Sequence, residues 1–238
     1  MPKSTISLLS AAALVLLLSA CSALGAPGYD LHRGDEERNM AEGVTITGES
    51  TEYELADVEL AVGMLSQYTQ KAYSNTHLLN TSWAAEGYPV DYVLDDMQLA
   101  VFLTESAQSD LTDLVTARAE TGESPKLQSY VQYVNELTFN KELAPSPDCS
   151  GENADEPTAC LQFDPPIVYD WTYSDGENGS LTMSTGVLPI VIKITTGGQM
   201  ANITYEYRSL TFHLVKNPAD TGPTFLIDSI ESEGTYLP

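Results

Sequence analysis

The spacing of apolar residues changes once along this chain, and that change constrains the fold more than any other feature. Over residues 56–74 apolar side chains recur every three or four positions, as on one face of a helix: Val58, Ala61, Val62, Leu65, Tyr68 and Ala72. From Ile167 onward they alternate at every second position, as in strands with one buried face. The sequence therefore predicts an α+β domain, with helices first and a curved antiparallel sheet second.

The first half of the domain predicts four helical segments. The first covers about 56–74, with acidic residues at its start and Lys71 near its end, as the helix dipole favours. A second continues the helical spacing over 93–103. Ser109 is predicted to cap a third, and Pro125 to begin a fourth that runs to Leu137.

The second half predicts a hairpin and three further strands. The hairpin joins 167–173 to 181–185 through a polar turn, and the later strands lie near 190–194, 203–215 and 225–230. On the longest strand the apolar positions change from odd numbers, at Tyr205 and Tyr207, to even numbers from Leu210 onward. This change of parity predicts a β-bulge or a sharp coil of the strand near Arg208 and Ser209.

The amino terminus has the outline of an export signal. Lys3 precedes an apolar run that ends in Leu18-Ser19-Ala20-Cys21, which resembles the lipobox of bacterial lipoprotein precursors. The resemblance implies that residues 1–20 are a signal peptide and that Cys21 becomes the lipidated first residue, anchoring the protein outside the cell membrane. The alternative is an uncleaved transmembrane helix, since the run approaches the ~20 residues that span a bilayer. Cleavage is favoured because no Lys or Arg follows the run before Arg33.

Composition divides the rest of the chain. Residues 21–54 are acidic and have no sustained apolar period, so we expect a flexible tether. Residues 55–238 form a single domain, with a helical half at 55–140, a connector at 141–166 and a sheet half at 167–238. The excess of 34 Asp and Glu over 10 Lys and Arg excludes nucleic acid as a partner, because a polyanion would be repelled.

The connector holds five prolines and the pair Cys149 and Cys160. With Cys21 consumed by lipid, these are the two remaining thiols of an exported domain, and we expect them to form a disulfide. A zinc or redox site is the alternative, but the two cysteines are eleven positions apart and no histidine lies near them.

The order of elements resembles that of the nuclear-transport-factor-2-like superfamily. The likeness depends on helices that precede the sheet and on the ending, a long strand 203–215, a polar turn and the short strand 224–228. It implies a cone-shaped α+β fold over about 56–231, although the extra helix and the cysteine-bearing connector depart from the compact pattern. Enzymes of that superfamily place Asp, His or Tyr inside the cone for proton transfer.

Aromatic residues supply the candidate site. Tyr169, Trp171, Tyr205 and Tyr207 have odd numbers on strands that are neighbours in the expected sheet, so they form a candidate ligand face. The alternative is core packing or cross-strand pairing. His213 has the opposite parity to its apolar neighbours and is expected to point away from the core.

No catalytic constellation, metal-binding motif or cofactor motif is present in the sequence. The sequence therefore predicts a lipid-anchored, non-enzymatic binding or scaffolding module at the cell envelope. Its expected partners are the membrane, through the anchor, and an envelope protein or a small molecule. The alternative is a small-molecule isomerase or hydrolase with a pocket inside the cone.

Overall fold

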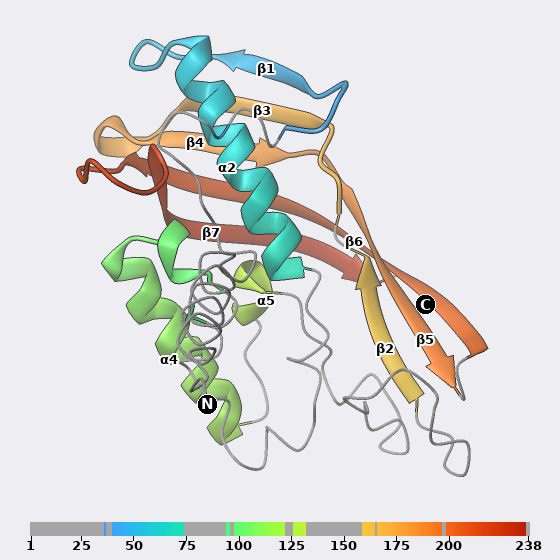
Figure 1. Ribbon diagram of the computed structural model, residues 1–238. Coiled ribbons are helices and arrows are strands. Elements are labelled where there is room, and N and C mark those ends of the chain that lie inside the picture. Colours follow the sequence, from blue (N-terminus) through green and yellow to red (C-terminus); the bar gives the residue numbers. More distant parts are fainter. Residues whose placement is uncertain are drawn as a thin grey trace, which may run out of the picture. The chain divides into compact units, whose positions relative to one another are not determined.

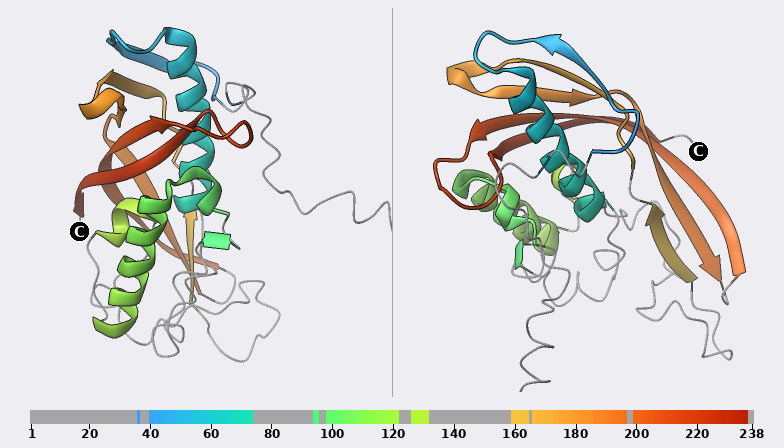
Figure 2. Two further views of the ribbon diagram at one scale, coloured as in Figure 1. Left: turned by 90° about the vertical axis from the view of Figure 1, so that its left-hand side faces the viewer. Right: turned by 45° about the horizontal axis from the view of Figure 1, so that its top comes forward.

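The computed structural model describes Glu36 and residues 40–73, 94–95, 98–121, 126–131, 159–164, 166–196 and 199–236. All of them belong to one compact unit, Leu31–Pro238. They form a seven-stranded sheet with helices α2 (Leu55–Tyr73), α4 (Glu105–Thr121) and α5 (Leu127–Tyr130) on one side of it, as Figures 1 and 2 show. The predicted α+β class is confirmed.

Strand β6 (Gln199–Lys216) organises the sheet. Along one side of it, β5 (Leu188–Thr196) pairs with its first half and β4 (Leu181–Thr185) with its second, while β7 (Phe225–Tyr236) pairs along the other side. Beyond β4 lie β3 (Asp170–Asp175) and then β1 (Thr45–Glu49), and beyond β5 lies β2 (Ala159–Asp164). Every pairing is antiparallel except that of β1 with β3.

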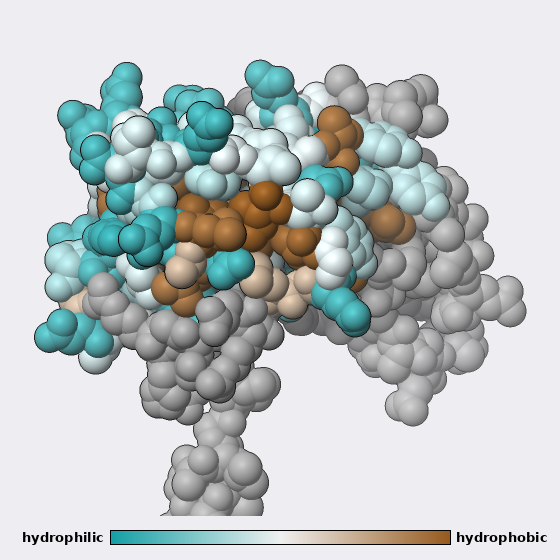
Figure 3. Space-filling model, turned by 90° about the horizontal axis from the view of Figure 1, so that it is seen from above, coloured by the Kyte–Doolittle hydropathy of each residue, from teal (hydrophilic) through white to brown (hydrophobic). Residues whose placement is uncertain are grey.

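Helix α2 forms where the apolar spacing predicted it, shifted by one residue. Tyr68 lies on the buried face of this helix. The centroid of its ring is 5.7 Å from that of Phe102 and 6.1 Å from that of Phe212 of β6, and both pairs are edge-on. Trp171 of β3 packs against the same Phe212, with 6.1 Å between the ring centroids. Tightly packed aromatic rings therefore fill the space between α2 and this part of the sheet. On the surface, seen from above, a band of hydrophobic residues lies between hydrophilic ones (Figure 3).

The bulge predicted near Arg208 and Ser209 is wrong. The even-numbered side chains of β6 are buried without interruption from Glu206 to Leu214. The change in apolar parity arises because two charged residues, Glu206 and Arg208, lie on the buried face. The pairing of β6 shifts its register at two other places. In the pairing with β5 the shift lies between Ile194 and Thr195, and in the pairing with β7 it passes over Asp228.

The predictions of a tether without regular structure and of an irregular connector are each wrong in one place, because each segment contains one strand. Within 21–54, the β-branched run at Thr45 forms β1, and the Thr45 amide donates to the Tyr169 carbonyl at 2.7 Å. A Cβ at Gly48 would lie 2.0 Å from the Tyr173 carbonyl oxygen, so only glycine allows this close pairing. The buried Glu36 carboxylate also accepts a hydrogen bond from the Thr224 amide.

Within the connector, residues 159–164 form β2, which pairs with β5. Both β1 and β2 escaped prediction because a short edge strand needs only one partner and leaves no long apolar period. Cys149 and residues 1–35 lie outside the described residues. The signal peptide, the lipid anchor and the disulfide therefore stay predictions.

The remaining helices differ from their predicted bounds. Helix α4 begins at Glu105 rather than near Ser109, because Thr104 caps it: its Oγ1 accepts a hydrogen bond from the Ala107 amide at 3.1 Å. Helix α5 ends at Tyr130, since Val131 is already extended. The described part of the predicted segment 93–103 contains a 3₁₀ helix, Ala100–Phe102.

Candidate functional site

The predicted aromatic face is not one surface. In the register of the sheet, Tyr173 lies opposite Met183, and Met183 lies opposite Phe212, so odd positions of β3 and β4 share a face with even positions of β6. Odd residue numbers on two different strands therefore do not mean that the side chains lie on the same face of the sheet. Trp171 is 1% exposed on the buried face, whereas Tyr205 is 45% exposed on the outer face.

Each of the four aromatic candidates has a distinct environment. Trp171 is part of the core, and its Nε1 is buried without a hydrogen-bond partner among the described residues. Tyr205 and Tyr207 follow each other on the outer face of β6. Tyr169 is exposed just before β3 begins. The proposal that Trp171 contacts a ligand together with Tyr205 is therefore wrong.

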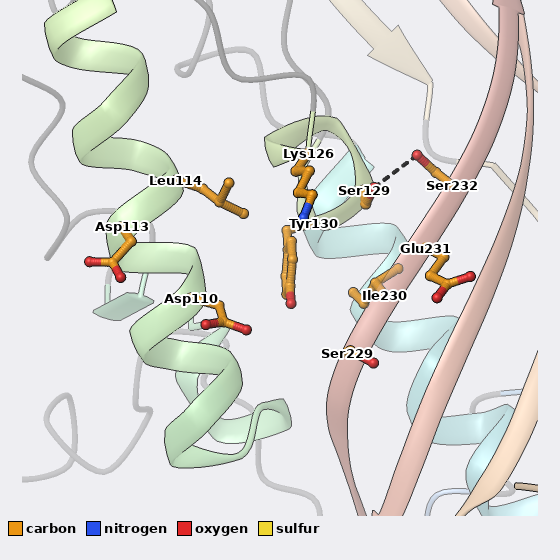
Figure 4. A pocket seen from close by; sticks show the side chains of 10 residues that line it. All are labelled: Asp110, Asp113, Leu114, Lys126, Ser129, Tyr130, Ser229, Ile230, Glu231 and Ser232. Atoms are coloured by element: carbon orange, nitrogen blue, oxygen red, sulfur yellow. Dashed lines mark hydrogen bonds between the residues drawn. The ribbon is translucent and has the colours of Figure 1, made fainter. Parts of the chain in front are cut away.

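A groove with a volume of about 610 Å³ lies between α4, α5 and β7 (Figure 4). This size is typical of pockets that hold small molecules or short peptide segments. We call it the α4–β7 groove, and it is lined by Asp110, Asp113, Leu114, Lys126, Ser129, Tyr130, Ser229, Ile230, Glu231 and Ser232.

The sequence of α4 explains its wall of the groove. Asp110, Asp113 and Leu114 are three and four residues apart, so they share one side of the helix. The neighbouring side carries Leu111 and Val115, which are buried. Leu114 points toward Tyr130 across the groove, and the Asp110 carboxylate lies near the hydroxyl end of the same ring (Figure 4). Helix α4 thus packs on the core with one side and lines the groove with the next.

The floor of the groove is fixed by hydroxyl groups. Ser129 Oγ and Ser232 Oγ are 2.9 Å apart and join α5 to β7 (Figure 4). Burial raises the pKa of Tyr130, and the Asp110 and Asp228 carboxylates raise it further. Tyr130 therefore keeps its proton at neutral pH, and its hydroxyl can donate a hydrogen bond.

The charge of the groove selects among ligands. Three exposed carboxylates, on Asp110, Asp113 and Glu231, stand against the single ammonium of Lys126 among the lining residues. This charge balance disfavours an anionic ligand relative to a neutral or cationic one. Leu114 and Ile230 add apolar contact area beside the hydroxyls.

A second polar cluster lies on the buried face of the sheet. Arg208 Nε donates to Glu206 Oε1 at 3.1 Å, and both side chains are 2% exposed. The Tyr73 hydroxyl lies beside this pair and donates to the Ser129 carbonyl at 2.7 Å. Burial raises the pKa of Tyr73 strongly, and the positive charge of Arg208 opposes that shift. Because the two charges satisfy each other, we interpret the pair as structural.

His213 lies on the outer face, as predicted. Its Nδ1 is 3.3 Å from Thr182 Oγ1 and its Nε2 is 3.8 Å from Glu231 Oε1. Within the described ranges, no group of three or more His, Cys, Asp or Glu side chains could hold a metal ion. No described helix is long and apolar enough to cross a membrane.

The sequence missed the α4–β7 groove because its walls come from residues more than a hundred positions apart. The sequence signal that could have indicated the groove is the polar side of α4, which lies next to its apolar side. Comparisons with family models, with curated proteins and with solved structures found no match for this chain.

Proposed function

We propose that this protein is a lipid-anchored binding or scaffolding module on the outer side of the cell membrane, and that the α4–β7 groove holds its partner or ligand. The anchor is proposed from the lipobox at Leu18 to Cys21. The observation that carries the binding role is the groove itself, an open space of about 610 Å³ with hydroxyls, carboxylates and apolar side chains around it.

The fold is proposed to be a nuclear-transport-factor-2-like cone. In support, α2 packs across one face of a curved sheet, and the long β6 returns through a polar turn into β7 (Figure 2). The catalytic pocket of such a cone would lie between α2 and the sheet. There the ring of Tyr68 packs against those of Phe102 and Phe212, and all three are fully buried.

This packing supports binding over catalysis. An acid–base enzyme needs two titratable groups that reach a substrate in one cavity. Glu206 and Arg208 are within hydrogen-bond reach of each other, but they are paired and buried. The carboxylates of the groove are exposed, and the groove is open and lined by polar and apolar side chains together, so it is not an enclosed reaction chamber.

The charge balance restricts the partner. Because carboxylates dominate both the groove and the whole chain, we expect a neutral or cationic partner at the cell envelope and no nucleic acid. The membrane is contacted through the lipid on Cys21.

Site-specific crosslinking tests this function in the full-length protein. A photoreactive p-benzoylphenylalanine replaces Leu114, which points into the groove, and in a matched control it replaces the exposed Thr116 of the same helix. We expect a defined adduct from position 114 that is absent at position 116. Equal adducts at both positions, or none at position 114, would contradict binding in the groove.

A further inference from the structure

The face of the sheet that points away from the helices carries two regular rows of polar side chains, most of them serine or threonine. Each row crosses β1, β3, β4, β6 and β7 in the observed register. The first row consists of Thr47, Thr172, Ser184, Thr211 and Glu231, and the second of Glu49, Ser174, Thr182, His213 and Ser229. Neighbouring members of a row are ~4.8 Å apart, and the two rows are separated by ~7 Å.

These side chains are accessible and keep hydrogen-bonding capacity. All members of the two rows are exposed or half-buried. Ser184 Oγ and Thr211 Oγ1 are 3.0 Å apart, and Thr172 Oγ1 donates to the Ser184 carbonyl at 3.5 Å. A hydroxyl has one proton to donate and two lone pairs to accept with, so one such contact leaves each group able to bind a further partner. The face therefore offers donors and acceptors together.

Two tyrosines extend this face along β6. Tyr205 and Tyr207 have the same parity as Thr211, so they lie on the same outer side of the strand. Tyr205 is 45% exposed and Tyr207 is half-buried. Each combines a flat apolar ring with a hydroxyl tip, which suits ligands that are partly apolar and partly hydroxylated.

The helices described for this chain all pack on the opposite face (Figures 1 and 2). The pattern differs from that of an ordinary protein interface, because the core of such an interface is enriched in apolar and aromatic residues. Here the two tyrosine rings lie on β6, ~14 and ~20 Å along the strand before Thr211, and hydroxyls extend from Thr211 across five strands. Glu49 and Glu231 stand at the ends of the rows, so an anionic polymer would be repelled.

We propose that this outer face is a binding surface for a neutral glycan chain. A sugar ring presents an apolar C–H face, which fits on a tyrosine ring, and a rim of hydroxyls, which exchange hydrogen bonds with serine and threonine. Four strand spacings make the rows ~19 Å long, which fits an oligomer rather than a monosaccharide. The outer face shares Ser229 and Glu231 of the edge strand β7 with the lining of the α4–β7 groove. The other members of the rows and both tyrosines lie outside the groove, so the proposal would hold if the groove proved empty of function.

Titration of the full chain with cellohexaose and chitohexaose tests the proposal, with hexagalacturonate as the anionic comparison. We expect at least one neutral oligomer to bind with a dissociation constant of about 1 mM or lower. Tyr205→Ala and Thr211→Val should each weaken that binding about five-fold, which corresponds to the loss of one hydrogen bond or ring contact. Both positions are on the surface, so the fold is expected to persist and is checked by circular dichroism.

Thr116→Val, on the exposed side of α4, is the control for Thr211→Val and should leave glycan binding unchanged. Three results would overturn the proposal: no binding of either neutral oligomer up to ~10 mM, equal binding of hexagalacturonate, or unchanged affinity in both outer-face variants. If Asp110→Lys in the groove abolished binding and the outer-face variants did not, the glycan would belong to the groove and the outer-face site would be withdrawn.

Discussion

Breaking the buried ion pair of β6 should destabilise this protein strongly. In the structure, Arg208 Nε donates to Glu206 Oε1 at 3.1 Å and both side chains are 2% exposed. Arg208→Met removes the cation and leaves a buried carboxylate without its charged partner. Such a loss costs ~3–5 kcal/mol of unfolding free energy. For a domain of this size it corresponds to a fall in Tm of about 6–20 °C.

The double variant separates the pair from the packing around it. Replacing a buried ion pair by apolar side chains of similar volume is often neutral or stabilising. Glu206→Met combined with Arg208→Met should therefore recover most of the stability that Arg208→Met alone loses. The two single effects and the double effect, measured together, give the coupling energy between the two side chains.

Urea unfolding, followed by circular dichroism, measures these differences as midpoints at constant slope. Lys216→Met is the matched control on the same strand. Lys216 Nζ is 3.5 Å from Asp57 Oδ1, but it is half exposed, so its loss should cost less than about 1 kcal/mol. If Arg208→Met cost no more than Lys216→Met, Arg208 would be in solvent and the bulge expected from the apolar parity would be restored.

Four further predictions follow from the core, the hairpin and the cysteines. Trp171→Ala should lose ~3–5 kcal/mol in urea unfolding, because the indole is buried; near-native stability would remove it from the core. Asp175 accepts hydrogen bonds from the β1–α2 loop, and these bonds lower its pKa to about 2. The ionised Asp175 therefore stabilises the fold above its ordinary pKa, and this stabilisation is lost as the pH falls from about 4 to 2. Asp175→Asn should therefore lower Tm at pH 7 and have little effect near pH 2; a Tm difference that is independent of pH would contradict this. Cys21→Ala should prevent cleavage before residue 21 and fatty-acid labelling, and a variant that is still cleaved and labelled would disprove the anchor. Alkylation of the unreduced, denatured protein should label neither Cys149 nor Cys160, whereas two labelled thiols would exclude the disulfide.

Local pattern was sufficient for the elements that carry their own period. Helix α2 has a complete apolar stripe, and it was predicted within one residue at each end. The hairpin of β3 and β4 has alternating residues on both sides of a glycine-containing turn, and it formed around that turn. His213 was correctly assigned to the outer face because its apolar neighbours define the buried one.

Elements whose position depends on a distant partner were not predictable in this way. The prediction assumed that apolar positions mark the buried face, but Glu206 and Arg208 are buried because each neutralises the other. Strand β1 depends on contact with β3, more than a hundred residues away. The α4–β7 groove likewise exists only once α4, α5 and β7 are packed together.

The affinity of the partner crosslinked at position 114 shows whether that partner binds in the α4–β7 groove. It would be measured for the wild type, for Asp110→Lys in the groove and for Thr116→Lys. Asp110→Lys changes the charge of the groove from negative to positive, whereas Thr116→Lys adds one positive charge outside it. We expect Asp110→Lys to weaken binding ten-fold or more, about 1.4 kcal/mol, and Thr116→Lys to change it less than about two-fold. Equal dissociation constants for the wild type and Asp110→Lys, or equal losses in the two variants, would contradict this expectation.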